Sequence, residues 1–267
     1  MTATTPGALP ADIENGLRRL KLGTMRRLAP ELLVTAKTQR WTPEEVLRTL
    51  LEAELTSRDA SNINTRMKAA AFPAAKTVEQ FDLAASSFPA ATWDYLCSLE
   101  WIRARENFAA VGPAGTGKSH SQIAVGIAAI HAGFKVRYLA ADDLVETLYR
   151  GLADNSVGRI IEGLLRNDLV IIDELGFAPL DHTGTQLLFR FVAAAYEHRS
   201  LAISSHQPFD QWGTFLPEHT TATSMLDRLL HRCVVVVTQG DSYRMRDAKT
   251  RLTNGGGHNP QTRQSKP

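Results

Sequence analysis

The feature that most constrains the fold is the octapeptide Gly112-Pro-Ala-Gly-Thr-Gly117-Lys118-Ser119, which fits the pattern G-x-x-x-x-G-K-[ST]. It follows a short apolar run, NFAAVG, and leads into a segment with helical periodicity over 117–132. Glycines let backbone N–H groups approach phosphate oxygens closely, and the helix adds its positive dipole end. We expect Lys118 to contact the β- and γ-phosphates of ATP and Ser119 to ligate Mg²⁺. The plainer alternative is a glycine-rich turn with an incidental lysine.

A second motif is Leu169-Val-Ile-Ile-Asp173-Glu174. Its first acid, Asp173, lies 55 residues after Lys118. Four apolar residues predict a buried strand, whose carboxyl end delivers both acids to the ligand-binding edge of an α/β sheet. We expect Asp173 to hold Mg²⁺ through its water shell and Glu174 to polarise the attacking water. A kinase acceptor supplies its own hydroxyl, so the extra Glu174 favours hydrolysis over phosphoryl transfer. Acids that merely end a strand are the alternative.

The chain changes its pattern at Asn107, after which short apolar runs alternate with helical segments. The alternation predicts an α/β fold with five parallel strands. The predicted strands cover 107–112, 135–141, 168–174, 201–206 and 233–239, and the predicted helices cover 117–132, 142–153, 156–166, 183–198 and 221–232.

The part before Asn107 is predicted to be helical. One helix is expected at about 13–37, and a second begins at Thr42-Pro43-Glu44-Glu45, which fits a threonine N-cap followed by proline and an acidic third position. The predicted organisation is residues 1–11 disordered, 12–68 an N-terminal helical domain that binds DNA or a partner, 69–105 a linker with a helix at about 90–103, 106–252 the ATPase core, and 253–267 a disordered tail.

Charge is distributed unevenly along the chain. Residues 1–105 hold 14 Lys and Arg against 12 Asp and Glu, residues 106–239 hold 10 against 14, and residues 240–267 hold 6 against 2. Basic ends are compatible with nucleic-acid binding, although a solvated basic tail is the commoner cause. Cys97 and Cys233 have no His or Cys at ligand spacing, which favours the cytoplasm over an oxidising compartment. Neither a secretory signal nor an apolar stretch of roughly 18 residues is visible, so we expect no membrane contact.

The segments GPAGTGKSH, DLVIIDELGFAPLD, SSHQPFDQWG, MLDRLLHR and GDSYRMR resemble, in this order and spacing, the IstB-type transposition helper ATPases. These belong to the AAA+ class, beside the DnaC-type helicase loaders. LKLGTMRRLAPELL resembles their helical domain, and the resemblance covers about residues 15–247. It implies a P-loop AAA+ core with the strand order 5-1-4-3-2. It also implies a homo-oligomer on duplex DNA, with ATP at subunit interfaces, and a transposase partner encoded by the same insertion element.

The resemblance implies three further site residues. His206 stands where the family places a polar sensor, usually Asn, and the alternative is a residue that only caps the strand. Arg228 stands where AAA+ proteins carry an arginine finger that reaches a neighbour's γ-phosphate; the alternative is a local interaction on its own helix. Arg244 aligns with a basic position of the C-terminal motif, and a nucleotide sensor and a DNA contact are equally supported.

Other residues gain a role mainly from the resemblance. The resemblance favours a DNA- or partner-binding surface for a basic stretch, whereas the residues alone favour a solvated helix face. The stretch comprises Arg18, Arg19, Lys21, Arg26 and Arg27. Phe81 is interpreted as a hydrophobic anchor or as a ring that stacks near adenine.

The predicted nucleotide-binding residues are Gly112, Pro113, Ala114, Gly115, Thr116, Gly117, Lys118, Ser119 and His120, of which His120 is interpreted chiefly as a helix residue.

The sequence thus predicts a Mg²⁺-dependent ATPase that assembles on target DNA and assists a transposase. Three alternatives stay open. A DnaC-like protein would deliver a replicative helicase instead, and a P-loop kinase would phosphorylate a small metabolite. The third is a switch with weak turnover, suggested by His206, in which ATP only controls DNA binding.

Overall fold

The computed structural model describes residues 7–217, 219–240, 242, 243 and 245. Its backbone contacts divide the chain into two compact units with the boundary between Thr65 and Arg66, three residues before the expected end of the helical domain. Arg244, the predicted tail 253–267 and the first six residues lie outside the described residues.

The first unit is helical, with α1 (Ala11–Arg19), α2 (Gly23–Gln39) and the greater part of α3 (Pro43–Ala70). The single helix expected over 13–37 is divided in two, because Lys21 takes a left-handed backbone conformation with φ 57°. The expected start of α3 is confirmed. The Thr42 N–H donates to Glu45 Oε2 at 2.7 Å, and the Glu45 N–H donates to Thr42 Oγ1 at 3.3 Å, which is a reciprocal capping box.

A buried carboxylate fixes the start of α2 against α3. Glu54 accepts hydrogen bonds from the backbone N–H groups of Thr24 at 2.8 Å and Met25 at 3.0 Å. Leu22, which precedes α2, offers no side-chain cap, so Glu54 of α3 satisfies donors that the helix itself leaves open. Arg58 donates to Glu54 at 2.9 Å and to the Lys21 carbonyl at 2.8 Å. Glu54 therefore fixes the start of α2, the helix that carries Arg26 and Arg27 of the basic stretch.

We expect Glu54→Gln to loosen the start of α2. The Met25 backbone N–H and Arg58 hold the pKa of Glu54 below its ordinary value of 4.5. A lowered pKa in the folded chain means that this stabilisation is present at neutral pH and is lost as the pH falls through that lowered pKa. Amide hydrogen exchange at Thr24 and Met25 should become faster in the variant at pH 7. Glu52→Gln, an exposed change on the same helix, should leave these amides protected, and equal exchange in both variants would contradict the prediction.

The second unit contains a five-stranded parallel sheet in the order β2-β3-β4-β1-β5, which confirms the expected order. The strands are β1 (Asn107–Val111), β2 (Val136–Ala140), β3 (Leu169–Leu175), β4 (Ser200–Ser205) and β5 (Cys233–Val237). The first five residues of β3 are all buried, as a central strand covered on both faces requires.

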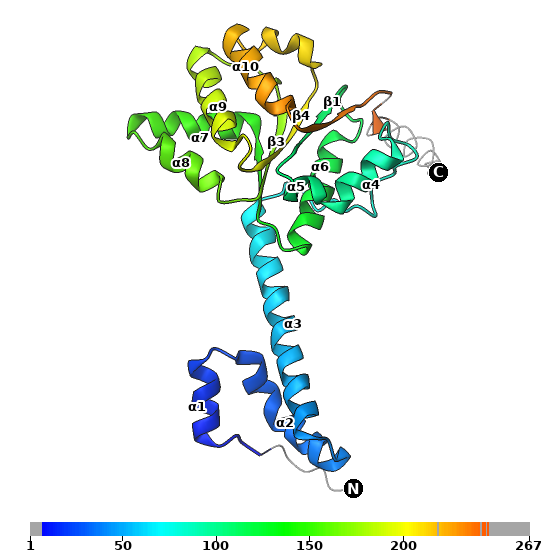
Figure 1. Cartoon of the computed structure of the whole chain (residues 1–267), viewed down its shortest axis with the longest axis vertical. Coiled ribbons are helices and arrows are strands. Elements are labelled where there is room, and N and C mark those ends of the chain that lie inside the picture. Colours follow the sequence, from blue (N-terminus) through cyan, green and yellow to red (C-terminus); the bar gives the residue numbers. More distant parts are fainter. Residues whose placement is uncertain (1–6, 218, 241, 244, 246–267) are drawn as a thin grey trace, which may run out of the picture. The chain divides into compact units, whose positions relative to one another are not determined.

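Helices cover both faces of the sheet (Figure 1). One face packs against α7 (Ala141–Ala153), α8 (Val157–Leu164), α9 (His182–Ala195) and α10 (His219–Leu230), with a short 3-10 helix, η1 (Phe209–Thr214), beside them. The other face carries α4 (Ala90–Ser98), α5 (Glu100–Arg103) and α6 (Lys118–His131). The helix expected at about 90–103 is divided at Leu99, whose φ is 62°. Within the described chain, no helix is long and apolar enough to cross a membrane.

Candidate functional site

The glycine-rich loop joins β1 to α6 and curls around the Lys118 ammonium group. Lys118 Nζ donates to the carbonyl oxygens of Gly112 at 2.7 Å and Pro113 at 2.6 Å. Gly112 has φ 143°, and a Cβ there would lie 2.2 Å from the Thr238 carbonyl oxygen. At Gly115, with φ 79°, a Cβ would lie 2.1 Å from Ser242 Oγ. Only glycine can follow this path, so the loop keeps the shape of a cradle.

One cavity of about 1030 Å³ brings the two predicted motifs together. Its walls include the predicted residues Pro113, Ala114, Gly115, Thr116, Gly117, Lys118, Ser119, His120, Asp173, Glu174 and His206. The loop and the acid pair therefore lie on the same edge of the sheet, at the carboxyl ends of the parallel strands, where α/β proteins bind ligands.

Asp173 is held by three hydroxyl groups from three different elements. The residue is only 3% exposed, and its carboxylate accepts hydrogen bonds from Ser119 Oγ at 2.9 Å, from Tyr138 Oη at 2.6 Å and from Ser204 Oγ. Burial, followed by the bond to Asp173, raises the pKa of Tyr138, so the phenol stays protonated and remains a donor.

Glu174 lies on an irregularity of β3. The pairing with β4 shifts between Ile172 and Leu175, so Asp173 and Glu174 together face Ser204, as in a β-bulge. Glu174 has φ 61°, an unusual conformation for a residue other than glycine. Its N–H donates to Ser204 Oγ at 2.8 Å and to its neighbour Asp173 Oδ1 at 3.1 Å. The bulge buries the first carboxylate and leaves the second exposed at the cavity.

The residues present fit a nucleoside triphosphate with a divalent metal ion. A hydroxyl and a buried carboxylate form a donor set of oxygens, which is the set that Mg²⁺ prefers. The ammonium group of Lys118 and the positive end of α6 supply the charge that phosphate oxygens need. The cradle, this oxygen donor set and the exposed Glu174 carboxylate occur in one cavity.

His206 and Arg228 are placed differently. His206 follows β4, is exposed and lines the cavity, with its ring centroid 6.2 Å from that of Phe177. Arg228 is absent from the residues that line this cavity. Its Nη1 donates to the Ser224 carbonyl at 2.9 Å, and its guanidinium carbon lies 5.1 Å from the centroid of the Phe189 ring. The arginine finger in trans stays a prediction.

Phe81 belongs to an aromatic cluster beside the loop. Its ring stacks on Trp93 with centroids 4.3 Å apart, and the His120 ring lies 5.3 Å away. A Cβ on Gly117 would lie 3.1 Å from Phe81, so the ring also reaches the cavity wall. His120 Nε2 lies 3.3 Å from the Thr77 carbonyl oxygen, and burial lowers the pKa of His120. The cluster thereby attaches the segment before β1 to the start of α6.

Sequence reasoning missed several residues at the site. Tyr138 and Ser204 contact Asp173, and the stretch after β5 covers the loop: the Tyr243 N–H donates to the Gly115 carbonyl at 2.9 Å. Strand pairing would have been needed to find Tyr138, because β2 and β3 lie far apart in the sequence. The position of Ser204 was a usable signal, because it lies near the end of a predicted strand, two residues before His206.

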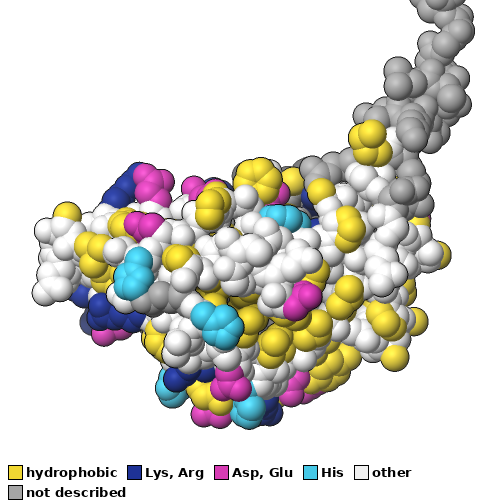
Figure 2. Space-filling model, turned by 90° about the horizontal axis from the view of Figure 1, so that it is seen from above, with side chains coloured by type: hydrophobic (Ala, Val, Ile, Leu, Met, Phe, Trp, Pro, Cys, Tyr) yellow, Lys and Arg dark blue, Asp and Glu magenta, His cyan; other side chains and the backbone are white. Residues whose placement is uncertain are grey.

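Five of the predicted DNA-contacting residues lie in the first unit, and the sixth, Arg244, lies outside the described residues. Arg18, Arg19, Lys21, Arg26 and Arg27 are all exposed. Arg18 also pairs with Glu14 at 3.1 Å, within α1. On the face that Figure 2 draws, charged side chains of both signs are interspersed.

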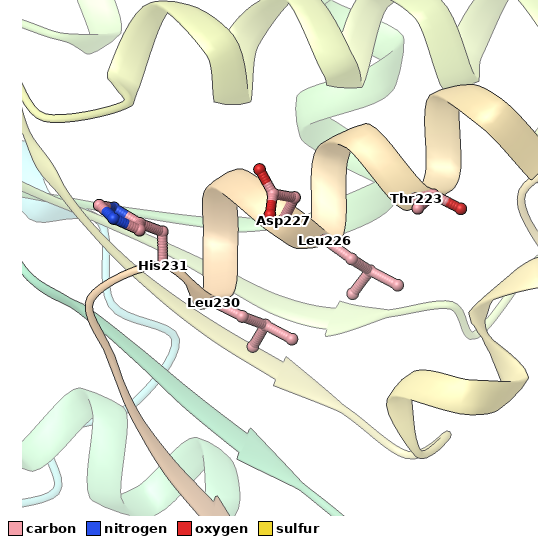
Figure 3. Close-up of a pocket in the computed structure, with 5 residues that line it drawn as sticks. All are labelled: Thr223, Leu226, Asp227, Leu230 and His231. Atoms are coloured by element: carbon pink, nitrogen blue, oxygen red, sulfur yellow. The ribbon is translucent and has the colours of Figure 1, made fainter.

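A second hollow, of about 450 Å³, lies along α10 (Figure 3). It is lined by Thr223, Leu226, Asp227, Leu230 and His231 and shares none of these residues with the cavity at the loop. No residue of either sequence motif lines this hollow.

The sequence matches the model of the family described as IstB-like ATP binding protein over residues 15–251. The chain is 34% identical over 232 residues to a relative from insertion sequence IS5376 of Geobacillus stearothermophilus, a match that covers 86% of this chain and 92% of that protein. A relative from insertion sequence IS21 of Pseudomonas aeruginosa is 31% identical over 239 residues, covering 89% and 90% of the two chains. Both relatives are named for ATP binding.

Solved structures share the fold at low sequence identity. The structure of AMPPCP-bound DnaA from Aquifex aeolicus has a TM-score of 0.50 and 19% identity, and covers 69% of this chain and 57% of that one. The structure of DnaI has a TM-score of 0.52 and 12% identity, and covers 61% and 91%. At these identities the likeness shows the fold alone.

Proposed function

The chain belongs to the family of IstB-like ATP binding proteins, and from this premise we propose that it is a Mg²⁺-dependent ATPase that assembles on duplex DNA and assists a transposase. One observation carries the ATPase assignment. The Ser119 hydroxyl donates to Asp173 at 2.9 Å, which joins the two motifs in the cavity that Lys118 and Glu174 also line.

The proposed chemistry divides the work among these side chains. Lys118 neutralises the β- and γ-phosphates, while Ser119 and Asp173 would hold Mg²⁺, which when bound would offset the phosphate charge. Glu174 orients a water molecule and accepts its proton as the water oxygen bonds to the γ-phosphorus. The bond to the bridging oxygen breaks, so that ADP and phosphate leave. His206 is proposed to donate a hydrogen bond near the attacking water.

The proposed partners rest on the relatives. Their names place them in insertion sequences, which supports a transposase encoded by the same element. We assign duplex DNA to the exposed basic stretch of the first unit, and a homo-oligomer in which Arg228 serves the neighbour's nucleotide. The proposed cytoplasmic location rests on Cys97 and Cys233, which are free thiols.

An ATPase assay titrated with duplex DNA tests this function, together with sizing of the protein with and without a slowly hydrolysed ATP analogue. We expect DNA to stimulate phosphate release and the analogue to enlarge the complex. Phosphate transfer to a metabolite without DNA stimulation would instead establish a kinase. Co-purification with a replicative helicase, and with no transposase, would establish a helicase loader.

We expect the double change Arg26→Gln and Arg27→Gln to weaken DNA binding regardless of sequence. Each lost phosphate contact should reduce the slope of log affinity against log salt by about 1, so the slope should fall by about 2. Fluorescence anisotropy over a salt series measures this. Lys37→Gln with Arg48→Gln removes two exposed charges elsewhere in the same unit and should leave the slope unchanged. Equal slopes in both doubles would reject this surface.

A further inference from the structure

Asp173 receives donors on both of its carboxylate oxygens, and two of these donors, Tyr138 and Ser204, belong to neither motif. Tyr138 Oη donates to Oδ2 at 2.6 Å, whereas Ser119 and Ser204 donate to Oδ1. The Ser119 hydroxyl stays within hydrogen-bond distance of Oδ1, at 2.9 Å, only while the carboxylate plane keeps its orientation. The bond to Oδ2 opposes rotation of that plane.

Tyr138 is itself held firmly. It lies on β2 in register with Ile171 of β3, and its ring packs edge-on against Phe72 with centroids 6.2 Å apart. Phe72 in turn is wedged near Gly126 of α6, where a Cβ would lie 3.0 Å from the ring. The phenol therefore reaches Asp173 from a ring that packs between β2, the Phe72 side chain and α6.

Ser204 performs a different task at the same place. Its hydroxyl donates to Asp173 and accepts the Glu174 N–H at 2.8 Å, so one side chain bridges both members of the bulge. Ser204 is 1% exposed, and its strand is buried throughout. The left-handed conformation of Glu174 needs support from its surroundings, and this hydrogen bond supplies it.

We propose that Tyr138 and Ser204 are positioning residues for the acid pair: Tyr138 orients the Asp173 carboxylate for the metal ion, and Ser204 fixes the backbone that carries Glu174. The inference rests on the proposed ATPase function. The two roles predict different defects: a changed Mg²⁺ dependence when Tyr138 is altered, and slower turnover when Ser204 is altered. A general loss of folding would produce both defects together.

Tyr138→Phe tests the first role, because it removes the hydroxyl and keeps the ring against Phe72. Binding of AMPPCP to the full chain is measured by calorimetry in EDTA and over a Mg²⁺ titration. We expect the Mg²⁺ concentration for half-maximal enhancement to rise about tenfold, with the metal-free affinity within about twofold of the original. Tyr95→Phe removes a similar bond, from Tyr95 Oη to Glu106 at 2.7 Å, and should change neither quantity.

A combined variant shows whether Tyr138 acts through Asp173. In an Asp173→Asn background, Tyr138→Phe should have no further effect on the Mg²⁺ titration. An unchanged titration in Tyr138→Phe alone would overturn the assignment, as would a parallel fall of the metal-free affinity. Failure of the unaltered protein to bind AMPPCP would instead sink the ATPase proposal itself.

Ser204→Ala tests the second role. We expect turnover to fall about tenfold or more while the KM for ATP and the Mg²⁺ titration change by less than about twofold, because Glu174 loses its fixed position. Ser200→Ala removes a buried hydroxyl from the other end of β4 and should leave turnover intact. Equal losses in both serine variants, or a change in KM alone for Ser204→Ala, would overturn this role.

Discussion

Replacing Lys118 with alanine is expected to abolish nucleotide binding by the full chain. Lys118 is 8% exposed, and its ammonium group lies within the loop, 2.7 Å from the Gly112 carbonyl oxygen and 2.6 Å from that of Pro113. Two charge-assisted contacts to phosphate, at about 1.5–3 kcal/mol each, correspond to roughly 10²- to 10⁴-fold in affinity. The variant also loses the ammonium around which the loop curls. Calorimetry with ATP and Mg²⁺ should then detect no uptake.

Two controls make this result specific. Lys76→Ala removes a lysine that lines the same cavity but is not part of the loop, and it should retain binding within a few-fold. Lys118→Arg keeps the charge but replaces a compact ammonium by a broad planar group, so it should bind far more weakly than the original. Normal ATP affinity in Lys118→Ala would show that the triphosphate does not lie on this loop.

The parts of the fold that followed from the sequence are those with local causes. The alternation of apolar runs and helical segments predicted five parallel strands, and Thr42 with Glu45 predicted the start of α3. The glycine pattern placed the loop after β1, because only glycine adopts these backbone angles without strain. The strand order came from the family resemblance and not from the residues themselves.

What the sequence did not reveal depends on contacts between distant residues. Glu54 caps α2 through the N–H of Thr24, 30 positions earlier, and no local pattern indicates such a partner. Lys21 and Leu99 interrupt predicted helices with positive φ angles, although neither is glycine. At the site, Asp173 and Glu174 were predicted from their place at a strand end. The hydroxyl of Tyr138 reaches Asp173 only because β2 pairs with β3 in one particular register.

Replacing Glu174 with glutamine is expected to stop turnover and leave nucleotide binding in place. Glutamine has nearly the same size and keeps the backbone N–H that donates to Ser204 at 2.8 Å, so the bulge should survive. It cannot accept a proton from water, and loss of such a base costs about 10²- to 10⁴-fold in rate. Single-turnover phosphate release should fall accordingly, whereas AMPPCP affinity should stay within about twofold.

The control for this change uses another glutamate in the same backbone conformation. Glu197 has φ 59° and is exposed, but it precedes β4 at the opposite end of the sheet from the cavity, so Glu197→Gln should hydrolyse ATP normally. The comparison separates the charge at the bulge from any general effect of a left-handed glutamate. A Glu174→Gln variant that hydrolyses ATP at the original rate would remove Glu174 from the chemistry. Slow and equal rates in the original protein and in Glu174→Gln would favour the alternative of an ATP-controlled DNA-binding switch, in which His206 replaces the usual sensor.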